Sequence, residues 1–246
     1  MIKVQNVSKS FKTSAGSVDA LKNVSLEIAD SECVVIAGEN GSGKSVLMSI
    51  ISGLEKADKG KVVCSSRNDN GKNARAGLVF QEAETQILGE TVLEDVEFGP
   101  KNLGWNKNRI KLATEVALEK VGLTEKKDFP ARFLSGGEKR RLAVASQLAM
   151  ERDIIIFDEP YANLDFTGVK QVNSLVKQLK QDEKTVIILT HEIEKCLALA
   201  DKFVVLFRGE KVFDGTVESG LKQNLEQWNI RNPLVSYKTF EDLLWL

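Results

Sequence analysis

The stretch GENGSGKS, from Gly38 to Ser45, is the part of this sequence best suited to bind phosphate. It matches the pattern G-x-x-x-x-G-K-[ST] without a gap. Glycines at these positions let backbone N–H groups turn toward phosphate oxygens at the positive end of a following helix. The lysine reaches the β- and γ-phosphates, and the serine holds Mg²⁺. The predicted nucleotide site comprises Gly38, Asn40, Gly41, Ser42, Gly43, Lys44 and Ser45.

Two acids end the apolar run of IIIFDEP, which begins at Ile154. A carboxylate at the end of a buried run is costly unless it binds or reacts. We expect Asp158 to bind Mg²⁺ through water, and Glu159 to act as general base for the attacking water. The alternative is a helix-capping acid beside Pro160. The phosphate-binding pattern upstream favours the catalytic interpretation.

Two further polar residues end apolar runs: Gln81 ends AGLVFQ, and His191 ends VIILTH. Gln81 could accept a hydrogen bond from the attacking water and also touch Mg²⁺. His191 is the only histidine in the chain, and a lone histidine at a strand end is more often structural than catalytic. Its expected position at the nucleotide edge favours a γ-phosphate contact, because imidazole can donate whether or not it is charged.

A second glycine pair occurs in LSGGE, where Ser135 and Glu138 form the capping-box pattern S-x-x-E. Capping does not require Gly136 or Gly137. Two glycines expose bare N–H groups at a positive helix end, which predicts an anion site. Because the chain has one set of hydrolytic groups, a second anion site indicates that two chains share each nucleotide.

The short apolar runs before these polar residues predict the strands of a sheet, which would bring the polar residues together at one edge of that sheet. Val/Ile/Leu runs bounded by polar residues are typical of strands buried on both faces, and ligands bind at the carboxyl ends of parallel strands. We expect strands over 33–38, 76–81, 154–159, 186–191 and 203–207. We expect helices over 45–53, 136–150, 168–181 and 192–200, and further helical stretches between 81 and 134. The alternating first thirty residues, with KGKVVCSS from Lys59, predict an antiparallel sheet. The expected fold is α/β: a P-loop NTPase core of mostly parallel sheet with an antiparallel β subdomain and an inserted helical subdomain.

Composition excludes several classes of protein. The 246 residues carry a formal net charge of −1, which does not favour a nucleic-acid binder. The cysteines, Cys33, Cys64 and Cys196, form no CxxC pair, so we expect buried thiols in a reducing cytosol. The start MIKVQNVSKS is too polar for a signal peptide, and no apolar run could span a bilayer.

The order of GENGSGKS, Gln81, LSGGE, IIIFDEP, NLD and His191 resembles that of ATP-binding-cassette ATPases. The resemblance covers residues 1–215, with a helical subdomain at about 82–135 and a tail at 216–246. It implies a head-to-tail dimer that binds two MgATP, each between one P-loop and Ser135, Gly136 and Gly137 of the other chain. It also implies that Phe11 stacks on adenine, the alternative being a core aromatic. Asp165 would lie at the dimer interface.

The segment from Gln81 to Gly99 is similar to energy-coupling-factor importer ATPases, with Gln86, Val92, Asp95 and Phe98 matching. This implies a second ATPase subunit, identical or paralogous, and transmembrane coupling and substrate-binding subunits, with the chain peripheral on the cytoplasmic face of the membrane. Alternatives are a conventional importer or exporter ATPase, or a soluble ATP-switched module acting on nucleic acid or ribosomes. The sequence departs from the usual pattern at Glu39, Val46, Ala83, Tyr161 and Phe166.

Residues 81–100 contain six acids and no lysine or arginine. A charge run is often only a solvated face. In the resembling family, this region forms the groove that receives helices of the membrane subunit, and in energy-coupling-factor systems those helices carry arginine. Carboxylates pair well with arginine. We therefore expect Glu94, Asp95 and Glu97 to include the main contacts to the membrane partner.

Overall fold

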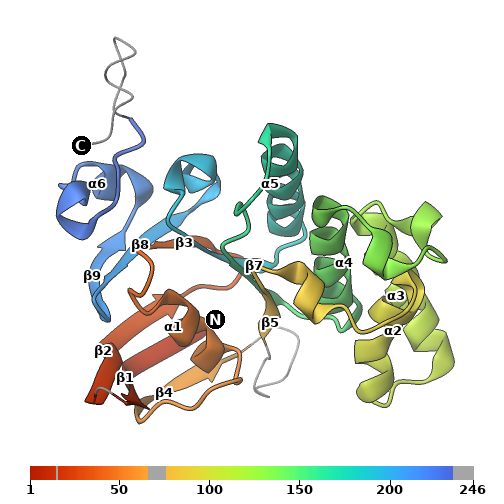
Figure 1. The fold of residues 1–246 in the computed structure, drawn as a ribbon, viewed down its shortest axis with the longest axis horizontal. Helices are drawn as coiled ribbons and strands as arrows, with labels where there is room; N and C mark the ends of the chain where they lie inside the picture. Colours follow the sequence, from red (N-terminus) through yellow and green to blue (C-terminus); the bar gives the residue numbers. More distant parts are fainter. Residues whose placement is uncertain (15, 66–75, 235–246) are drawn as a thin grey trace.

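A six-stranded sheet forms the centre of the molecule (Figure 1). The computed structural model describes residues 1–14, 16–65 and 76–234. The strand order is β5-β6-β7-β3-β8-β9, and all strands are parallel except β9. The strands are β3 (Cys33–Ala37), β5 (Ala76–Val79), β6 (Ile154–Asp158), β7 (Thr185–Thr190), β8 (Lys202–Phe207) and β9 (Glu210–Gly215). The mostly parallel sheet expected from the apolar runs is confirmed.

A three-stranded antiparallel sheet lies beside the central one, in the order β2-β1-β4. Its strands are β1 (Ile2–Thr13), β2 (Gly16–Ile28) and β4 (Lys59–Cys64). Their alternating side chains bury one face, as expected where one side of a sheet packs on the core. The antiparallel subdomain predicted from the first thirty residues and from KGKVVCSS is confirmed.

The central sheet is covered on both faces, which explains its continuous apolar strands. In β3, the side chains of Val34 and Ile36 pack with helix α1 (Lys44–Ile51) and the antiparallel sheet. Cys33, Val35 and Ala37 face the opposite cluster, with α4 (Gly136–Ala149) and α5 (Phe166–Gln181). These helices begin and end within about two residues of the predicted bounds. Helices α1 and α4 therefore lie on opposite faces of the sheet (Figure 1).

The chain between β5 and β6 is mainly helical and lies at the right of Figure 1. Helices α2 and α3 pack against α4 there. The elements are η1 (Ala83–Gln86), α2 (Val92–Asn102), α3 (Lys107–Lys120), η2 (Thr124–Lys126) and η3 (Ala131–Phe133), followed by α4. Helical structure in this region agrees with the expectation, whereas its treatment as a subdomain over 82–135 stays a prediction.

The predicted helix over 192–200 is wrong. Two 3₁₀ turns, η4 (Ile193–Lys195) and η5 (Leu197–Leu199), occupy this segment. The Lys195 carbonyl accepts from the Asn173 side-chain amide, while the Leu199 N–H donates to the Cys196 carbonyl. A tertiary hydrogen bond thus takes the acceptor that an α-helix would use for its i+4 N–H.

After β9, the chain forms α6 (Val217–Leu221) and η6 (Leu225–Trp228). Leu225 and Ile230 are buried in the same cluster as Phe203 of the central sheet, so residues 217–230 pack onto the main fold. The stretch FEDLLWL lies outside the described residues. Within the described ranges, no helix combines the length and the apolar character needed to cross a membrane.

Candidate functional site

The loop between β3 and α1 has a backbone that requires glycine at two positions. Gly38 and Gly43 have φ angles of 157° and 103°, outside the range that other residues readily adopt. A Cβ at Gly38 would lie 2.3 Å from the Leu206 carbonyl oxygen, and one at Gly43 would lie 2.5 Å from that of Ala20. The loop is therefore clamped between β2 and β8 at the start of α1, the arrangement that suits an anion.

Lys44 is buried, and its ammonium group is held within the loop. Its Nζ donates to the carbonyl oxygens of Gly38, at 2.7 Å, and Glu39, at 3.1 Å. It also lies 3.5 Å from Glu159 Oε1. The nearby Ser42 hydroxyl is buried without a hydrogen-bond partner. A buried cation beside an unpartnered donor fits a site that receives phosphate oxygens.

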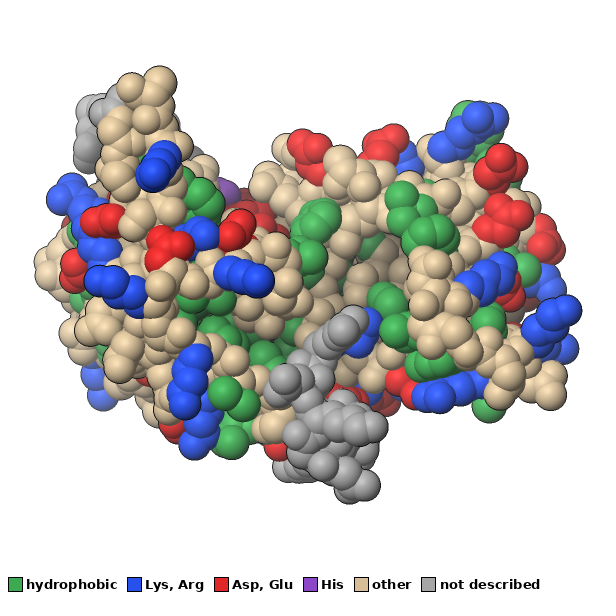
Figure 2. Space-filling view, turned by 90° about the horizontal axis from the view of Figure 1, so that it is seen from below, with side chains coloured by type: hydrophobic (Ala, Val, Ile, Leu, Met, Phe, Trp, Pro, Cys, Tyr) green, Lys and Arg blue, Asp and Glu red, His purple; other side chains and the backbone are tan. Residues whose placement is uncertain are grey.

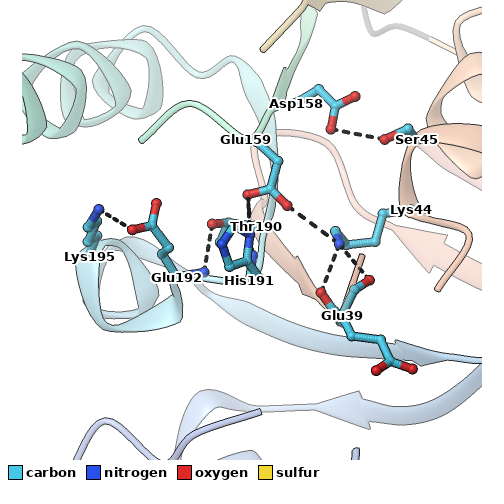
Figure 3. A network of polar contacts seen from close by, with 10 residues as sticks. Glu39, Lys44, Ser45, Asp158, Glu159, Thr190, His191, Glu192 and Lys195 are labelled. Carbon is cyan, nitrogen blue, oxygen red and sulfur yellow. Dashed lines mark hydrogen bonds and ion pairs between the residues drawn. The ribbon is translucent and has the colours of Figure 1, made fainter. Parts of the chain in front are cut away.

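Asp158 and Ser45 meet at the same edge. Ser45 Oγ donates to Asp158 Oδ1 over 3.2 Å, joining the first turn of α1 to the end of β6 (Figure 3). Burial raises the pKa of the Asp158 carboxyl, and the Ser45 hydrogen bond opposes this shift. Hydroxyl and carboxylate oxygens are the ligands that Mg²⁺ prefers when phosphates supply the others. The pair therefore fits the predicted metal position.

Glu159 lies between Lys44 and His191 (Figure 3). Its Oε2 is 3.0 Å from His191 Nδ1 and 3.3 Å from the His191 backbone nitrogen. Its Oε1 is buried and accepts no hydrogen bond. The residue has a φ of 46°, and its N–H donates to the Leu189 carbonyl over 2.9 Å. The helix-cap alternative for the two acids does not describe this arrangement, in which one carboxylate contacts both the lysine and the histidine.

Gln81 contacts the rest of the chain through its backbone, and within the described ranges no hydrogen bond joins it to Lys44, Asp158, Glu159 or His191. Its carbonyl accepts from Arg140 over 3.1 Å, while its exposed side chain has no hydrogen bond among the described residues. Arg140 of α4 is only 6% exposed, and burial lowers its pKa. Its Nε and Nη1 have no partner. The sequence analysis did not predict this hydrogen bond between Arg140 and Gln81. The one available signal was that Arg140 lies four residues after Gly136 and therefore on the same face of the helix.

The LSGGE stretch forms the start of α4 as predicted. Ser135 and Glu138 make the reciprocal capping box, and Lys126 binds Glu138 over 2.6 Å. A Cβ added at Gly136 would meet no atom within 4 Å, so packing within the chain does not demand glycine there. Gly137 is also near the surface. Helices α4 and α1 cover opposite faces of the sheet, and the binding of a partner's nucleotide by these two glycines stays a prediction.

Phe11 and Asp165 lie on the surface. Phe11 is 39% exposed, with Lys9 Nζ 5.2 Å from its ring centroid, so the alternative of a core aromatic is wrong. Asp165 caps α5 by accepting from the Gly168 N–H over 2.7 Å. Adenine stacking by Phe11 and a dimer contact by Asp165 stay predictions.

The structure corrects the expected membrane contact of Asp95, which is 5% exposed. Its Oδ1 accepts from the N–H groups of Leu88 and Gly89, and its Oδ2 accepts from Ser146. Both carboxylate oxygens accept hydrogen bonds inside the chain, where they fix the turn before α2. The sequence could not show this, because an acid in a charge run carries no mark of burial.

Glu94 and Glu97 of α2 make different contacts. Glu94 is exposed and completes a capping box with Thr91. Glu97 pairs with Lys101 and lines a groove of about 660 Å³ between α2 and α3. A second groove, of about 580 Å³, is lined by Glu84, Ile87, Gly89, Glu90, Thr91, Pro130, Arg132 and Lys139. Its charges are mixed, in keeping with the interspersed acids and bases of the helical region in Figure 2.

A glycine loop ending in lysine and serine, with two acids and a histidine on neighbouring strands, defines a P-loop nucleotide hydrolase. Comparison with known proteins specifies it further. The ABC transporter family matches residues 21–162. The chain is 40% identical over 230 residues to the energy-coupling factor transporter ATP-binding protein EcfA of Carboxydothermus hydrogenoformans, covering 91% of this chain and 84% of that protein. It is 41% identical over 220 residues to EcfA2 of Thermotoga maritima, covering 87% and 82%.

Solved structures similar to this chain also belong to ABC transporters. CbiO1 of Clostridium perfringens, part of the ABC transporter complex cbiONQ, matches with a TM-score of 0.78 and 29% identity over 94% of this chain and 95% of that one. A dimeric post-hydrolysis state of the cassette MJ0796, bound to ADP and Pi, matches with a TM-score of 0.75 and 31% identity over 88% and 99%. The chain belongs to the ABC transporter family, as an ATP-binding cassette ATPase.

Proposed function

We propose that this chain is the ATP-hydrolysing subunit of an energy-coupling-factor importer, peripheral on the cytoplasmic face of the membrane. The contact of Glu159 with both Lys44 and His191 carries the hydrolytic part of this proposal. The names of the relatives, two of which are energy-coupling factor ATP-binding proteins, support the transport part. In this role, the chain converts ATP hydrolysis into movement of transmembrane and substrate-binding subunits.

Each residue of the site has a defined task in this proposal. Lys44 exchanges its carbonyl contacts for phosphate oxygens. The free Oε1 of Glu159 accepts a proton from the attacking water. His191 donates to Glu159 through Nδ1, and it also donates to the γ-phosphate through Nε2 when both ring nitrogens carry a proton. Gln81 approaches the same phosphate. Mg²⁺ would be held by Ser45 and Asp158 and would neutralise phosphate charge.

The dimer is the second part of the proposal. Gly136 and Gly137 of one chain would receive the nucleotide bound by the P-loop of the other, because they begin a helix on the opposite face of the sheet from α1 and a Cβ at Gly136 would meet no atom of its own chain. The dimeric architecture of the cassette MJ0796 supports this arrangement. The second subunit is either another copy or a paralogue.

A mixing experiment tests the shared site. Lys44→Ala should lose ATP binding, whereas Gly136→Asp should bind ATP and not hydrolyse it, because its carboxylate repels the γ-phosphate. A mixed dimer has one site with both lesions and one site with neither. An equal mixture should therefore recover roughly a quarter of the wild-type activity per chain. Two differently tagged Lys44→Ala chains serve as the control. Mixed dimers that form but show no turnover would contradict the shared site.

Coupling to the membrane partner is proposed for the 580 Å³ groove beside α2. Glu90 lines this groove, and Glu94 lies next to it, accepting from the Glu90 N–H over 3.2 Å. A basic helix of the partner could pair with these carboxylates. Glu90→Lys should weaken co-purification with the transmembrane subunit in detergent and leave ATPase turnover of the isolated chain unchanged. Glu115→Lys, in the other groove, is the matched control. If only Glu115→Lys loses assembly, the partner binds the 660 Å³ groove and the proposal for the 580 Å³ groove is wrong.

A further inference from the structure

The C-terminal segment reaches the phosphate-binding loop through one side chain. Asn229 Nδ2 donates to Glu39 Oε2 over 2.7 Å, joining residues 190 positions apart. Glu39 is the second residue of GENGSGKS and one of the positions that depart from the usual pattern. We propose that Asn229 is a positioning residue for ATP binding, which holds the Glu39 carboxylate away from the phosphates and fixes the loop. The inference rests on the proposed role of residues 38–45.

Glu39 connects this contact directly to the proposed phosphate-binding lysine. Its carbonyl oxygen accepts from Lys44 Nζ and from the Ser42 N–H, both over 3.1 Å. Its carboxylate points away from Lys44 (Figure 3). One residue therefore holds Lys44 with its backbone and the C-terminal segment with its side chain. A change at Asn229 is transmitted to the loop through a single residue.

The backbone around Asn229 is held by hydrogen bonds and by buried neighbours. Asn229 ends η6 with a φ of 57°, a conformation that asparagine tolerates better than most residues. Its N–H donates to the Glu226 carbonyl over 2.9 Å, and the Ile230 N–H donates to that of Leu225 over 3.1 Å. Leu225 and Ile230 are buried in the main core. The amide of Asn229 is thus presented from a packed turn.

The charge of Glu39 explains why its orientation matters. A carboxylate in a phosphate-binding loop repels the nucleotide, and the repulsion grows as the distance falls. Without Asn229, the carboxylate can rotate toward the phosphates, and the loop loses one restraint. Both effects weaken ATP binding. A hydrogen bond to a charged, partly exposed group predicts a rise of about three- to tenfold in the dissociation constant for ATP.

The experiment measures equilibrium binding of MgATP to the full chain. Asn229→Gly removes the donor and keeps the left-handed backbone, and it should raise the dissociation constant. Asn229→Asp should raise it further, because two carboxylates then face each other. Asn23→Gly is the matched control, since Asn23 is exposed in β2 with a φ of 52°. It should bind ATP as the wild type does.

A double-mutant cycle separates positioning from simple destabilisation. In a Glu39→Ala background, Asn229→Gly should have no effect. Combining Glu39→Gln with Asn229→Asp exchanges donor and acceptor, and should bind ATP more tightly than Asn229→Asp alone. An equal loss in the Glu39→Ala background, or wild-type binding by Asn229→Gly, would overturn the inference.

Two further measurements keep the outcomes distinct. If Lys44→Ala binds ATP normally, the proposed role of the loop fails; if it loses binding while the Asn229 variants do not, only the present inference fails. Coupling between sites is reciprocal. ATP should therefore slow amide hydrogen exchange at residues 225–230 in the wild type, and the protection should shrink in Glu39→Ala. Equal protection in both proteins would also contradict the role of Asn229.

Discussion

Replacing Glu159 with glutamine tests the centre of the proposed mechanism. The amide keeps an oxygen that can accept from His191 Nδ1, now 3.0 Å from the carboxylate. It cannot take a proton from water, so ATP turnover should fall by about 10²–10⁴-fold, the usual contribution of a general base. ATP binding should persist or strengthen. Lys44 lies 3.5 Å from Glu159 Oε1, and two unit charges about 4 Å apart attract by roughly 4 kcal/mol near a protein surface before desolvation. Removing the negative charge of Glu159 ends this attraction, so Lys44 is free to bind phosphate.

The assay compares steady-state turnover at saturating MgATP with equilibrium nucleotide binding and with dimer mass by light scattering. Glu159→Gln with ATP should accumulate as a dimer, because hydrolysis no longer releases it. Glu192→Gln is the matched control, since Glu192 pairs with Lys195 rather than Lys44, and its turnover should stay close to that of the wild type. Turnover of Glu159→Gln within tenfold of the wild type would refute the assignment of the base.

Three further predictions concern the supporting residues. Lys126 holds the pKa of Glu138 at about 2, below its usual 4.5; this stabilisation is complete above the unfolded pKa and is lost as the pH falls from about 4.5 to about 2. Glu138→Gln should therefore flatten the pH dependence of the urea midpoint across that window. Asp95→Ala should lower the free energy of unfolding by about 1–3 kcal/mol in urea titration, because the partly buried N–H groups of Leu88 and Gly89 lose their acceptor. Ser45→Ala should raise the Mg²⁺ concentration for half-maximal turnover by about fivefold or more if Ser45 and Asp158 hold the metal.

The site at the sheet edge could be predicted because its residues follow strands that neighbour one another. Strand β7 pairs with both β6 and β3, so His191, Glu159 and the start of the P-loop must meet once these strands are parallel. The apolar runs determine the strands, and a strand's end determines where its polar residue lies. This reasoning needs only local sequence and the general rules of parallel sheets.

Contacts between distant elements could not be predicted in the same way. The segment 192–200 has helical spacing, yet the Asn173 amide takes the Lys195 carbonyl. Asp95 belongs to an acidic run, yet it is buried by hydrogen bonds that depend on the fold of the preceding turn. Arg140 and Asn229 form hydrogen bonds with Gln81 and Glu39, which lie far away in the sequence, and neither residue belongs to a recognised motif. Pairwise tertiary contacts leave no periodic signal in one sequence.

Glu159 combines features that stability alone would not favour. A left-handed backbone at a non-glycine residue costs of order 1 kcal/mol or more, and its φ is 46°. Its side chain is buried, and although Lys44 Nζ lies 3.5 Å from Oε1, this oxygen accepts no hydrogen bond, which costs free energy in a buried group. The positive φ occurs at the end of β6, where the N–H stays bound to Leu189 while the side chain reaches both Lys44 and His191. A more relaxed residue would satisfy the backbone and lose the contact. Strain, burial and an oxygen without a hydrogen bond at one carboxylate support the proposal that Glu159 is the general base.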